Sequence, residues 1–290
     1  MGCVELIVEK TYESPECRLN YAEGPDNGPP LLLLHGGQDR WQDYLPLMSV
    51  LITRWHLYAL DFRGHGRSEH TPGKYSLRSF TSDVATFTEQ RIGKPMMLVG
   101  HSMGGIIALM VAANHPNLVK ALVLGDAPPK ESLRAAAMHP LFTLTHQVVK
   151  SGGSFTDMYR DQESIGVEIP SHGLIRLADI RDGPSMIRNA KAMTLTDPEM
   201  YNVMMPGEQF TDWIEGYETD LILPKIGCPV LFIRGNPELG GMVPDADLRK
   251  LKDAVKDLIV YECRSMGHNI LNGFDEGMIR AVTYYLEAVR

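Results

Sequence analysis

The sequence predicts an α/β fold built on a mostly parallel sheet with helices on both faces. Short apolar runs recur along the chain with helical patterns between them, an alternation that is typical of βαβ units. These runs are continuously apolar, as strands are when helices cover both faces of a parallel sheet. The expected core strands are residues 31–34, 56–60, 96–99, 121–124, 230–233 and 258–261.

Two segments lie outside this regular alternation. Near the amino terminus, residues 4–8 and 18–22 read as two strands joined around Pro15, which we expect to form an antiparallel edge. After Asp126 the alternation stops, and it resumes near Ile226. We therefore expect a core made of residues 1–126 and 226–290, and a helical cap at 127–225 inserted between core strands. Cap helices are expected at 132–150, 174–180, 185–193 and 209–217.

Composition limits the partners that the chain can have. The chain has 28 Lys and Arg residues and 36 Asp and Glu residues, so its net charge is −8 and its electrostatic field repels nucleic acid. The apolar runs are far shorter than the roughly 20 residues that span a bilayer, so no membrane segment is expected. The four cysteines form no C-x-x-C pair, and we expect reduced thiols and no metal site. The first residues lack the pattern of a signal peptide, which favours a cytoplasmic location.

Ser102 is the candidate nucleophile. It lies in Gly-His-Ser-Met-Gly-Gly, residues 100–105, which matches the G-x-S-x-G elbow that lifts a serine hydroxyl above the edge of a sheet. The motif follows the expected strand 96–99 and precedes an apolar helical pattern, which is the strand–turn–helix context that the elbow requires. A serine in an ordinary turn is the alternative interpretation, and this context weighs against it.

An acyl-transfer serine also needs N–H groups that stabilise the oxyanion. One donor is expected at Met103, directly after the nucleophile. The second is expected in the loop after strand 31–34, and we place it on Gly37. In the same regions, His35 is expected to brace the loop, and His101 is expected to pack against its surroundings because adjacent residues of a tight turn point apart.

His268 is the candidate general base. A histidine on a loop after the last strand completes the order serine, acid, histidine, and His268 lies between the expected strand 258–261 and a closing helix. A neutral imidazole, with an ordinary pKa of roughly 6.5, accepts a hydroxyl proton near neutral pH.

Four segments together resemble the α/β-hydrolase superfamily in its branch of esterases, lactonases and C–C hydrolases. They are His35 to Gly37, Asp61 to Ser68, Gly100 to Gly105 and the pair Gly267 and His268. The resemblance implies a mostly parallel eight-stranded sheet, an inserted helical lid and no cofactor. It assigns no chemistry to Asp61 to Ser68. Within this family, Ser102 argues against haloalkane dehalogenase and epoxide hydrolase activity, because the relatives with those activities have Asp at this position.

The triad acid has two candidates. In the family, an Asp is common three residues after a glycine that ends a late strand, and Glu238 stands at that position after Gly235. The chain departs from the pattern because it has Glu there and because Pro237 precedes it. The alternative is Asp126, at the end of the preceding core strand. Either carboxylate would orient His268 and stabilise its imidazolium.

The expected reaction is hydrolysis of a small to medium carboxylic ester or lactone through an acyl-enzyme. A C–C bond hydrolase acting on diketones and a ligand-binding receptor that keeps the fold are the alternatives. The cap is rich in methionine and aromatic residues, which adapt to apolar ligands, and these residues equally serve to pack the cap on the core. The cap candidates for substrate contact are Met158, Tyr159 and Trp213. The sequence allows a homodimer through the cap or a sheet edge and does not require one.

Overall fold

A computed structural model describes residues 6–169, 173–180, 183–271 and 275–290. Eight strands form one sheet in the order β1-β2-β4-β3-β5-β6-β9-β10. The pairs from β4 through β3, β5, β6 and β9 to β10 are all parallel, and β1–β2 and β2–β4 are antiparallel. The strands are β1 (Val8–Glu13), β2 (Arg18–Glu23), β3 (Pro30–Leu34), β4 (His56–Leu60), β5 (Met96–His101), β6 (Val119–Gly125), β9 (Val230–Gly235) and β10 (Leu258–Cys263).

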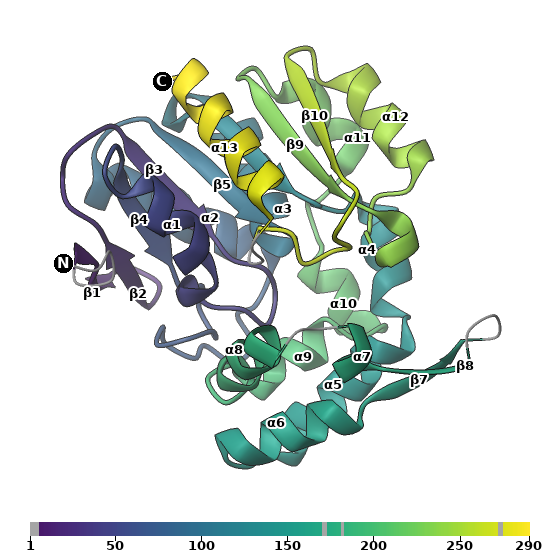
Figure 1. The fold of residues 1–290 in the computed structure, drawn as a ribbon. Coiled ribbons are helices and arrows are strands. Elements are labelled where there is room, and N and C mark those ends of the chain that lie inside the picture. Colours follow the sequence, from purple (N-terminus) through teal and green to yellow (C-terminus); the bar gives the residue numbers. More distant parts are fainter. Residues whose placement is uncertain (1–5, 170–172, 181–182, 272–274) are drawn as a thin grey trace.

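Helices cover both faces of this sheet (Figure 1). All residues of β3, β4 and β5 are buried, as the continuously apolar runs predict. Alternate leucines of β3 enter different clusters: Leu32 and Leu34 pack in one, Leu31 and Leu33 in the other. The core helices are α1 (Leu45–Leu51), α2 (Leu77–Phe87), α3 (Met103–Asn114), α12 (Asp245–Ala254) and α13 (Glu276–Ala288).

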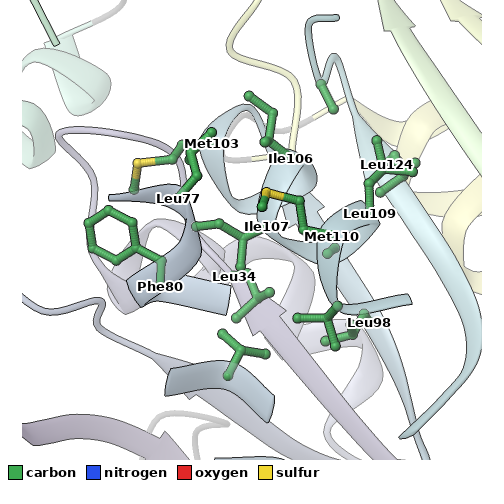
Figure 2. Packing of buried hydrophobic residues seen from close by; sticks show 14 of the residues in the cluster. Leu34, Leu77, Phe80, Leu98, Met103, Ile106, Ile107, Leu109, Met110 and Leu124 are labelled. Atoms are coloured by element: carbon green, nitrogen blue, oxygen red, sulfur yellow. The ribbon is translucent and has the colours of Figure 1, made fainter. Parts of the chain in front are cut away.

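Helix α3 is the most deeply buried of these helices. Ten of its twelve residues are buried, so it is apolar on all sides and has no solvated stripe. Figure 2 shows Ile106, Ile107 and Met110 of this helix among Leu34 of β3 and Leu98 of β5. This packing fixes the start of α3, and with it the turn that carries Ser102.

The segment between β6 and β9 is mostly helical, and most of it gathers at one end of the sheet (Figure 1). It contains α4 (Lys130–Ala137), α5 (Pro140–Ser151), α6 (Phe155–Ser164), β7 (Gly166–Ile169), β8 (Gly173–Arg176), α7 (Leu177–Ile180), α8 (Gly183–Met193), α9 (Pro198–Val203), α10 (Glu208–Trp213) and α11 (Thr219–Ile222). We call this segment the insert. Its treatment as a separate cap at residues 127–225 stays a prediction.

Three secondary-structure predictions within the insert are wrong, and one of them is the helix expected at 209–217, because α10 already ends at Trp213. The helix expected at 132–150 is two helices, because Pro140 begins a new one and cannot continue α4. The helix expected at 174–180 begins only at Leu177, because residues 173–176 form β8 and pair antiparallel with β7. Leu174 and Ile175 have apolar side chains that suit either structure, and the pairing partner decides between them.

The amino-terminal edge is antiparallel, as expected. β1 begins at Val8, later than the expected 4–8, and residues 1–5, including Cys3, lie outside the described part of the chain. The cysteines that the structure describes, Cys17, Cys228 and Cys263, are free thiols, in agreement with the prediction for them. No helix in the described ranges is both long and apolar enough to cross a membrane.

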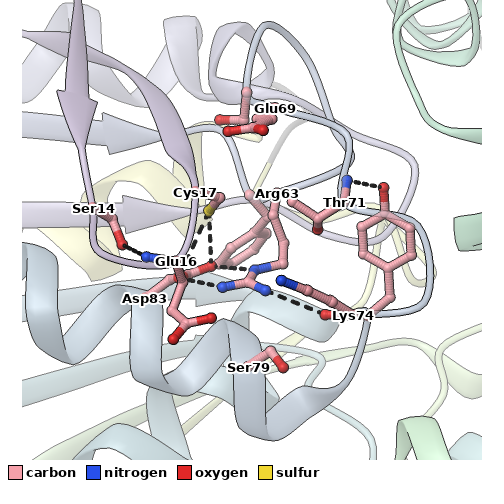
Figure 3. Close-up of polar contacts among 12 residues, drawn as sticks. Ser14, Glu16, Cys17, Arg63, Glu69, Thr71, Lys74, Ser79 and Asp83 are labelled. Carbon is pink, nitrogen blue, oxygen red and sulfur yellow. Dashed lines mark hydrogen bonds and ion pairs between the residues drawn. The ribbon is translucent and has the colours of Figure 1, made fainter.

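The segment from Asp61 to Ser68 has a structural role in the fold. Arg63 forms a buried bidentate ion pair with Asp83 of α2, with both N–O distances at 2.7 Å (Figure 3). Asp61 accepts backbone N–H groups from Trp41 and Arg67. A Cβ at Gly66, whose φ is +56°, would lie 2.1 Å from the Asp61 carboxylate, so only glycine fits there. These contacts hold the loop after β4 beside the loop after β3.

Candidate active site

Ser102 occupies the turn between β5 and α3 in a strained conformation. Its φ of +51° and ψ of −118° lie in a region that non-glycine residues rarely adopt. The glycines of the motif allow this turn, because a Cβ at Gly104 would lie 2.1 Å from the carbonyl oxygen of Leu34, and one at Gly100 would lie 2.4 Å from that of Gly104. The elbow predicted from the sequence is present, and it leaves the serine partly exposed.

His268 links Ser102 to Asp126. Its Nε2 lies 2.9 Å from the Ser102 hydroxyl, and its Nδ1 lies 2.8 Å from Oδ2 of Asp126. Because a carboxylate only accepts hydrogen bonds, Nδ1 carries the proton and the lone pair of Nε2 faces the serine. The three groups thus stand in the order that proton abstraction from the serine requires.

Of the two candidate acids, the structure brings Asp126 and not Glu238 to His268. Asp126 is fully buried at the end of β6, and its carboxylate also accepts N–H groups from Gly235, at 3.0 Å, and Met242, at 2.7 Å. Glu238 is exposed on a short 3₁₀ turn, Pro237–Leu239.

Backbone packing explains why Glu238 points away. The Asn236 N–H donates to the carbonyl of Met266, at 2.8 Å. A Cβ at Gly267 would lie 1.9 Å from the carbonyl oxygen of Leu239. The loop after β9 therefore packs backbone against the loop that carries His268, and it offers backbone N–H groups to Asp126 in place of a carboxylate to the histidine.

The environment favours the neutral form of His268. Burial lowers the pKa of His268 below its ordinary value, and the positive charge of a protonated His101 acts in the same direction. The hydrogen bond to Asp126 opposes both effects by stabilising the imidazolium. A base with a lowered pKa remains able to accept a proton in mildly acidic solution.

The loop after β3 holds the second predicted oxyanion donor, Gly37. His35 braces this loop as expected: Nδ1 donates to the carbonyl of Gly36 at 2.6 Å, and Nε2 accepts the Phe62 N–H at 3.1 Å. Accepting an N–H requires a neutral ring, and burial lowers the pKa of His35 accordingly. Gln38, next to Gly37, has a φ of +69°.

Backbone strain concentrates at this site. In the described ranges, the non-glycine residues with positive φ are Gln38, Ser102 and Asp126. Strain of this kind persists only where surrounding contacts enforce it, and it is common at active sites. Met103, the other predicted donor, begins α3, where the first N–H groups of a helix have no partner within the helix. The oxyanion role of Gly37 and Met103 stays a prediction that this arrangement favours.

His101 packs in the interior, as expected, and it also contacts the loop that carries His268. Its Nε2 donates to the backbone carbonyl of His268 at 2.7 Å, and the two ring centroids are 5.0 Å apart. Its Nδ1 lies 3.8 Å from Asp39. Despite burial, the neighbouring Asp39 carboxylate raises the pKa of His101 above its ordinary value. The sequence signal for this contact is weak, because it joins residues 101 and 268.

The insert packs against the site at Met204 and Trp213. Met204, directly after α9, packs over Gly37. Trp213, a predicted substrate contact, is buried in the same cluster as Met103 and Met204. Met158 packs in a separate cluster within the insert, with Tyr159 at its edge, and this cluster is distinct from the one that holds Met103 and Met204.

A partly buried ion pair also joins the insert to the loop after β3. Arg188 of α8 donates from Nε to Oδ1 of Asp43 at 3.2 Å. Burial is the main cause that raises the pKa of Asp43 to about 7, and the nearby Asp39 carboxylate raises it further, whereas the charge of Arg188 lowers it. Within the described ranges, no three His, Cys, Asp or Glu side chains are grouped to hold a metal ion.

The family model of the alpha/beta hydrolase fold matches residues 29–271. The chain belongs to the α/β-hydrolase fold family. A relative that this α/β hydrolase resembles, a serine hydrolase-like protein of Danio rerio, is 38% identical over 36% of this chain and 32% of the relative. The chain matches 32% to 54% of the length of the first such relatives.

Longer similarities also exist. An sn-1-specific diacylglycerol lipase of Danio rerio, ABHD11, is 29% identical over 80% of this chain and 74% of the relative. Among solved structures, a bacterial membrane phospholipase A is similar with a TM-score of 0.75 and 22% identity, over 100% of this chain and 88% of that one. At that identity, the structural similarity concerns the fold alone.

Proposed function

We propose that this α/β hydrolase is a serine hydrolase that cleaves a small to medium carboxylic ester or lactone through an acyl-enzyme. The observation that carries the proposal is the unbroken line of hydrogen bonds from Ser102 through His268 to Asp126. Membership of the family supports hydrolytic chemistry. The relative that is named a diacylglycerol lipase, which is an enzyme for ester bonds, supports the choice of substrate class.

The first half of the reaction forms the acyl-enzyme. The Ser102 oxygen attacks the carbonyl carbon while its proton moves to Nε2 of His268, and the negative charge of Asp126 stabilises the imidazolium. The carbonyl oxygen becomes an oxyanion that the N–H groups of Gly37 and Met103 would bind. When the tetrahedral species collapses, the C–O bond of the ester breaks and His268 returns the proton to the leaving alkoxide.

The second half releases the acid. Water attacks the acyl carbon, His268 takes the proton of that water, and Ser102 leaves with the proton returned to its oxygen. For a lactone the leaving hydroxyl stays attached to the acyl chain, so the single product is a hydroxy acid. An alkoxide is a better leaving group than an amide nitrogen, which is why we favour esters and lactones over amides.

The decisive test compares the wild-type protein with Ser102→Ala. We expect the wild type to hydrolyse p-nitrophenyl acetate and butyrate and to react covalently with a fluorophosphonate probe. The Ser102→Ala variant should lose both reactions while it keeps the wild-type circular-dichroism spectrum. Exposed Ser164→Ala is a matched control that should behave as wild type.

Other results would favour the other candidate functions. A folded wild-type protein with neither hydrolysis nor labelling would contradict the proposal and support a ligand-binding role. Turnover of vinylogous diketones far above that of esters and lactones would show a C–C hydrolase in place of an esterase.

A further inference from the structure

Met204 of the insert lies directly over Gly37 in the loop after β3, which we call the oxyanion loop. A Cβ built on Gly37 would lie 2.8 Å from Cε and 3.6 Å from Sδ of Met204, and 3.9 Å from Sδ of Met103. Met204 is 6% exposed and Met103 is 2% exposed. Two thioether side chains, one from the insert and one from α3, thus enclose the side of Gly37 where a side chain would otherwise project.

The segment that carries Met204 is firmly attached to the core. Asp197 caps α9 and accepts a hydrogen bond from the Tyr75 hydroxyl at 2.6 Å. The Asp197 N–H donates to the carbonyl of Gly64 at 2.8 Å. Glu199 accepts the Gly73 N–H at 2.6 Å. These bonds join α9 to the loop after β4, so the position of Met204 over Gly37 is set by several polar contacts and not by its own packing alone.

The same contacts leave the methionine side chain as the adjustable part. Its backbone is held through α9, while the thioether has three rotatable bonds and adapts to its neighbours. An ester whose carbonyl oxygen lies against the Gly37 N–H must place one of the two groups that flank the carbonyl close to this loop. That group and the Met204 side chain then compete for the same space.

We propose that Met204 is a specificity-determining residue that limits the size of the substrate group bound beside the oxyanion loop. This inference rests on the proposed function, because it assumes that Gly37 binds the carbonyl oxygen of an ester. It follows that the wild-type protein favours a short group at this position. Shortening residue 204 should open space for a longer one.

The experiment measures kcat/KM for two series of substrates on Met204→Ala. One series is p-nitrophenyl acetate, butyrate, hexanoate and octanoate, in which the acyl group grows. The other is alkyl acetates of increasing length, in which the alcohol grows. In one of the two series we expect the preference for longer over shorter members to rise about fourfold for each methylene that enters the vacated space. The series that responds identifies which group lies beside Gly37.

Two further variants make the comparison specific. Met205→Ala removes the same side chain from the next, half-buried residue and should keep the wild-type preference. Met204→Leu keeps a similar volume, so its preference should stay close to wild type, and it should remain measurable if Met204→Ala does not fold. If Met204→Ala does not fold, Met204→Val serves as the smaller residue, and its preference for longer substrates in the responding series should again rise.

The failures are distinguishable. If folded Met204→Ala or Met204→Val keeps the wild-type preference in both series while hydrolysis still depends on Ser102, the role of Met204 is refuted and the proposed function stands. If Met205→Ala shifts the preference as much as Met204→Ala, the assignment to Met204 is equally wrong. If the wild-type protein shows no Ser102-dependent hydrolysis, the proposed function falls and this inference falls with it.

Discussion

Replacing Asp126 with Asn tests the acid that the structure assigns. The carboxylate accepts three hydrogen bonds: Gly235 N–H reaches Oδ1, while Met242 N–H and His268 Nδ1 reach Oδ2. An amide offers one oxygen and one NH₂ group. If the amide oxygen of the Asp126→Asn side chain faces His268 and Met242, only the hydrogen bond from the Gly235 N–H is lost. If the oxygen faces Gly235, the hydrogen bonds from His268 and Met242 are both lost. The first orientation is therefore favoured, and it leaves the NH₂ group facing the Gly235 N–H.

The magnitude follows from charge and from hydrogen bonding. In the favoured orientation His268 keeps its tautomer, so the main loss is the negative charge beside the imidazolium. At about 4 Å and an effective dielectric constant of about 20, that charge is worth about 4 kcal/mol. This corresponds to a fall of about 10³-fold in kcat/KM. One buried N–H without an acceptor lowers the free energy of unfolding by about 1–3 kcal/mol.

The assay is hydrolysis of p-nitrophenyl acetate at about pH 8, where His268 is neutral in both proteins. Glu238→Gln is the matched control: it makes the same chemical change on an exposed side chain and should leave kcat/KM unchanged. A loss in Glu238→Gln equal to that in Asp126→Asn would refute the assignment. So would an Asp126→Asn variant that keeps activity within about tenfold of wild type, since removing a triad acid costs far more.

Three other predictions follow from the cited contacts. Because burial lowers the pKa of His268, and only its neutral form accepts the serine proton, kcat/KM should rise with pH around a midpoint below about 6.5; a midpoint above that value would contradict this. Arg63→Ala leaves the buried Asp83 carboxylate without its ion-pair partner and should lower the free energy of unfolding, measured by urea titration, by about 3–5 kcal/mol. The same change at the exposed Arg67 should lower it by less than about 1 kcal/mol. The pKa of Asp43, raised to about 7, means that the folded protein favours the protonated carboxyl, so its ionisation lowers the free energy of unfolding as pH rises from about 4 to about 7. Over that interval the free energy of unfolding of Asp43→Asn should rise relative to that of wild type by up to about 4 kcal/mol. A difference between the two proteins that stays constant with pH would refute the raised pKa.

Local patterns were enough to predict the sheet and the nucleophile. The strands of the core are continuous apolar runs, and each expected core run lies within an observed strand. The glycines that allow the turn at Ser102 lie within a few residues of it, so the motif can be recognised locally, although Gly104 is needed because it approaches the carbonyl oxygen of Leu34. His268 follows the last strand, and parallel strands place the loops after their carboxyl ends at one edge of the sheet. These features need only short-range sequence information and the rules of a parallel sheet.

The acid and the insert contacts required the tertiary structure. Asp126 and Glu238 both follow core strands at the same edge, and sequence pattern alone left the choice between them open. The structure decides it because the loop after β9 packs backbone to backbone against residues 266–267, which leaves Glu238 in solvent and Asp126 beneath His268. Residues 173–176 form a strand only because β7 lies beside them.

The sequence by itself thus determined which fold the chain adopts and which hydroxyl and imidazole meet at the edge of the sheet. Only the tertiary structure decided which carboxylate supports the imidazole and that Met204 covers Gly37. The physical reason is the kind of constraint. The parallel strands place the loops that carry Ser102 and His268 at one edge of the sheet even though these residues are 166 positions apart, whereas the contacts of Asp126 and Met204 depend on how whole loops pack against one another.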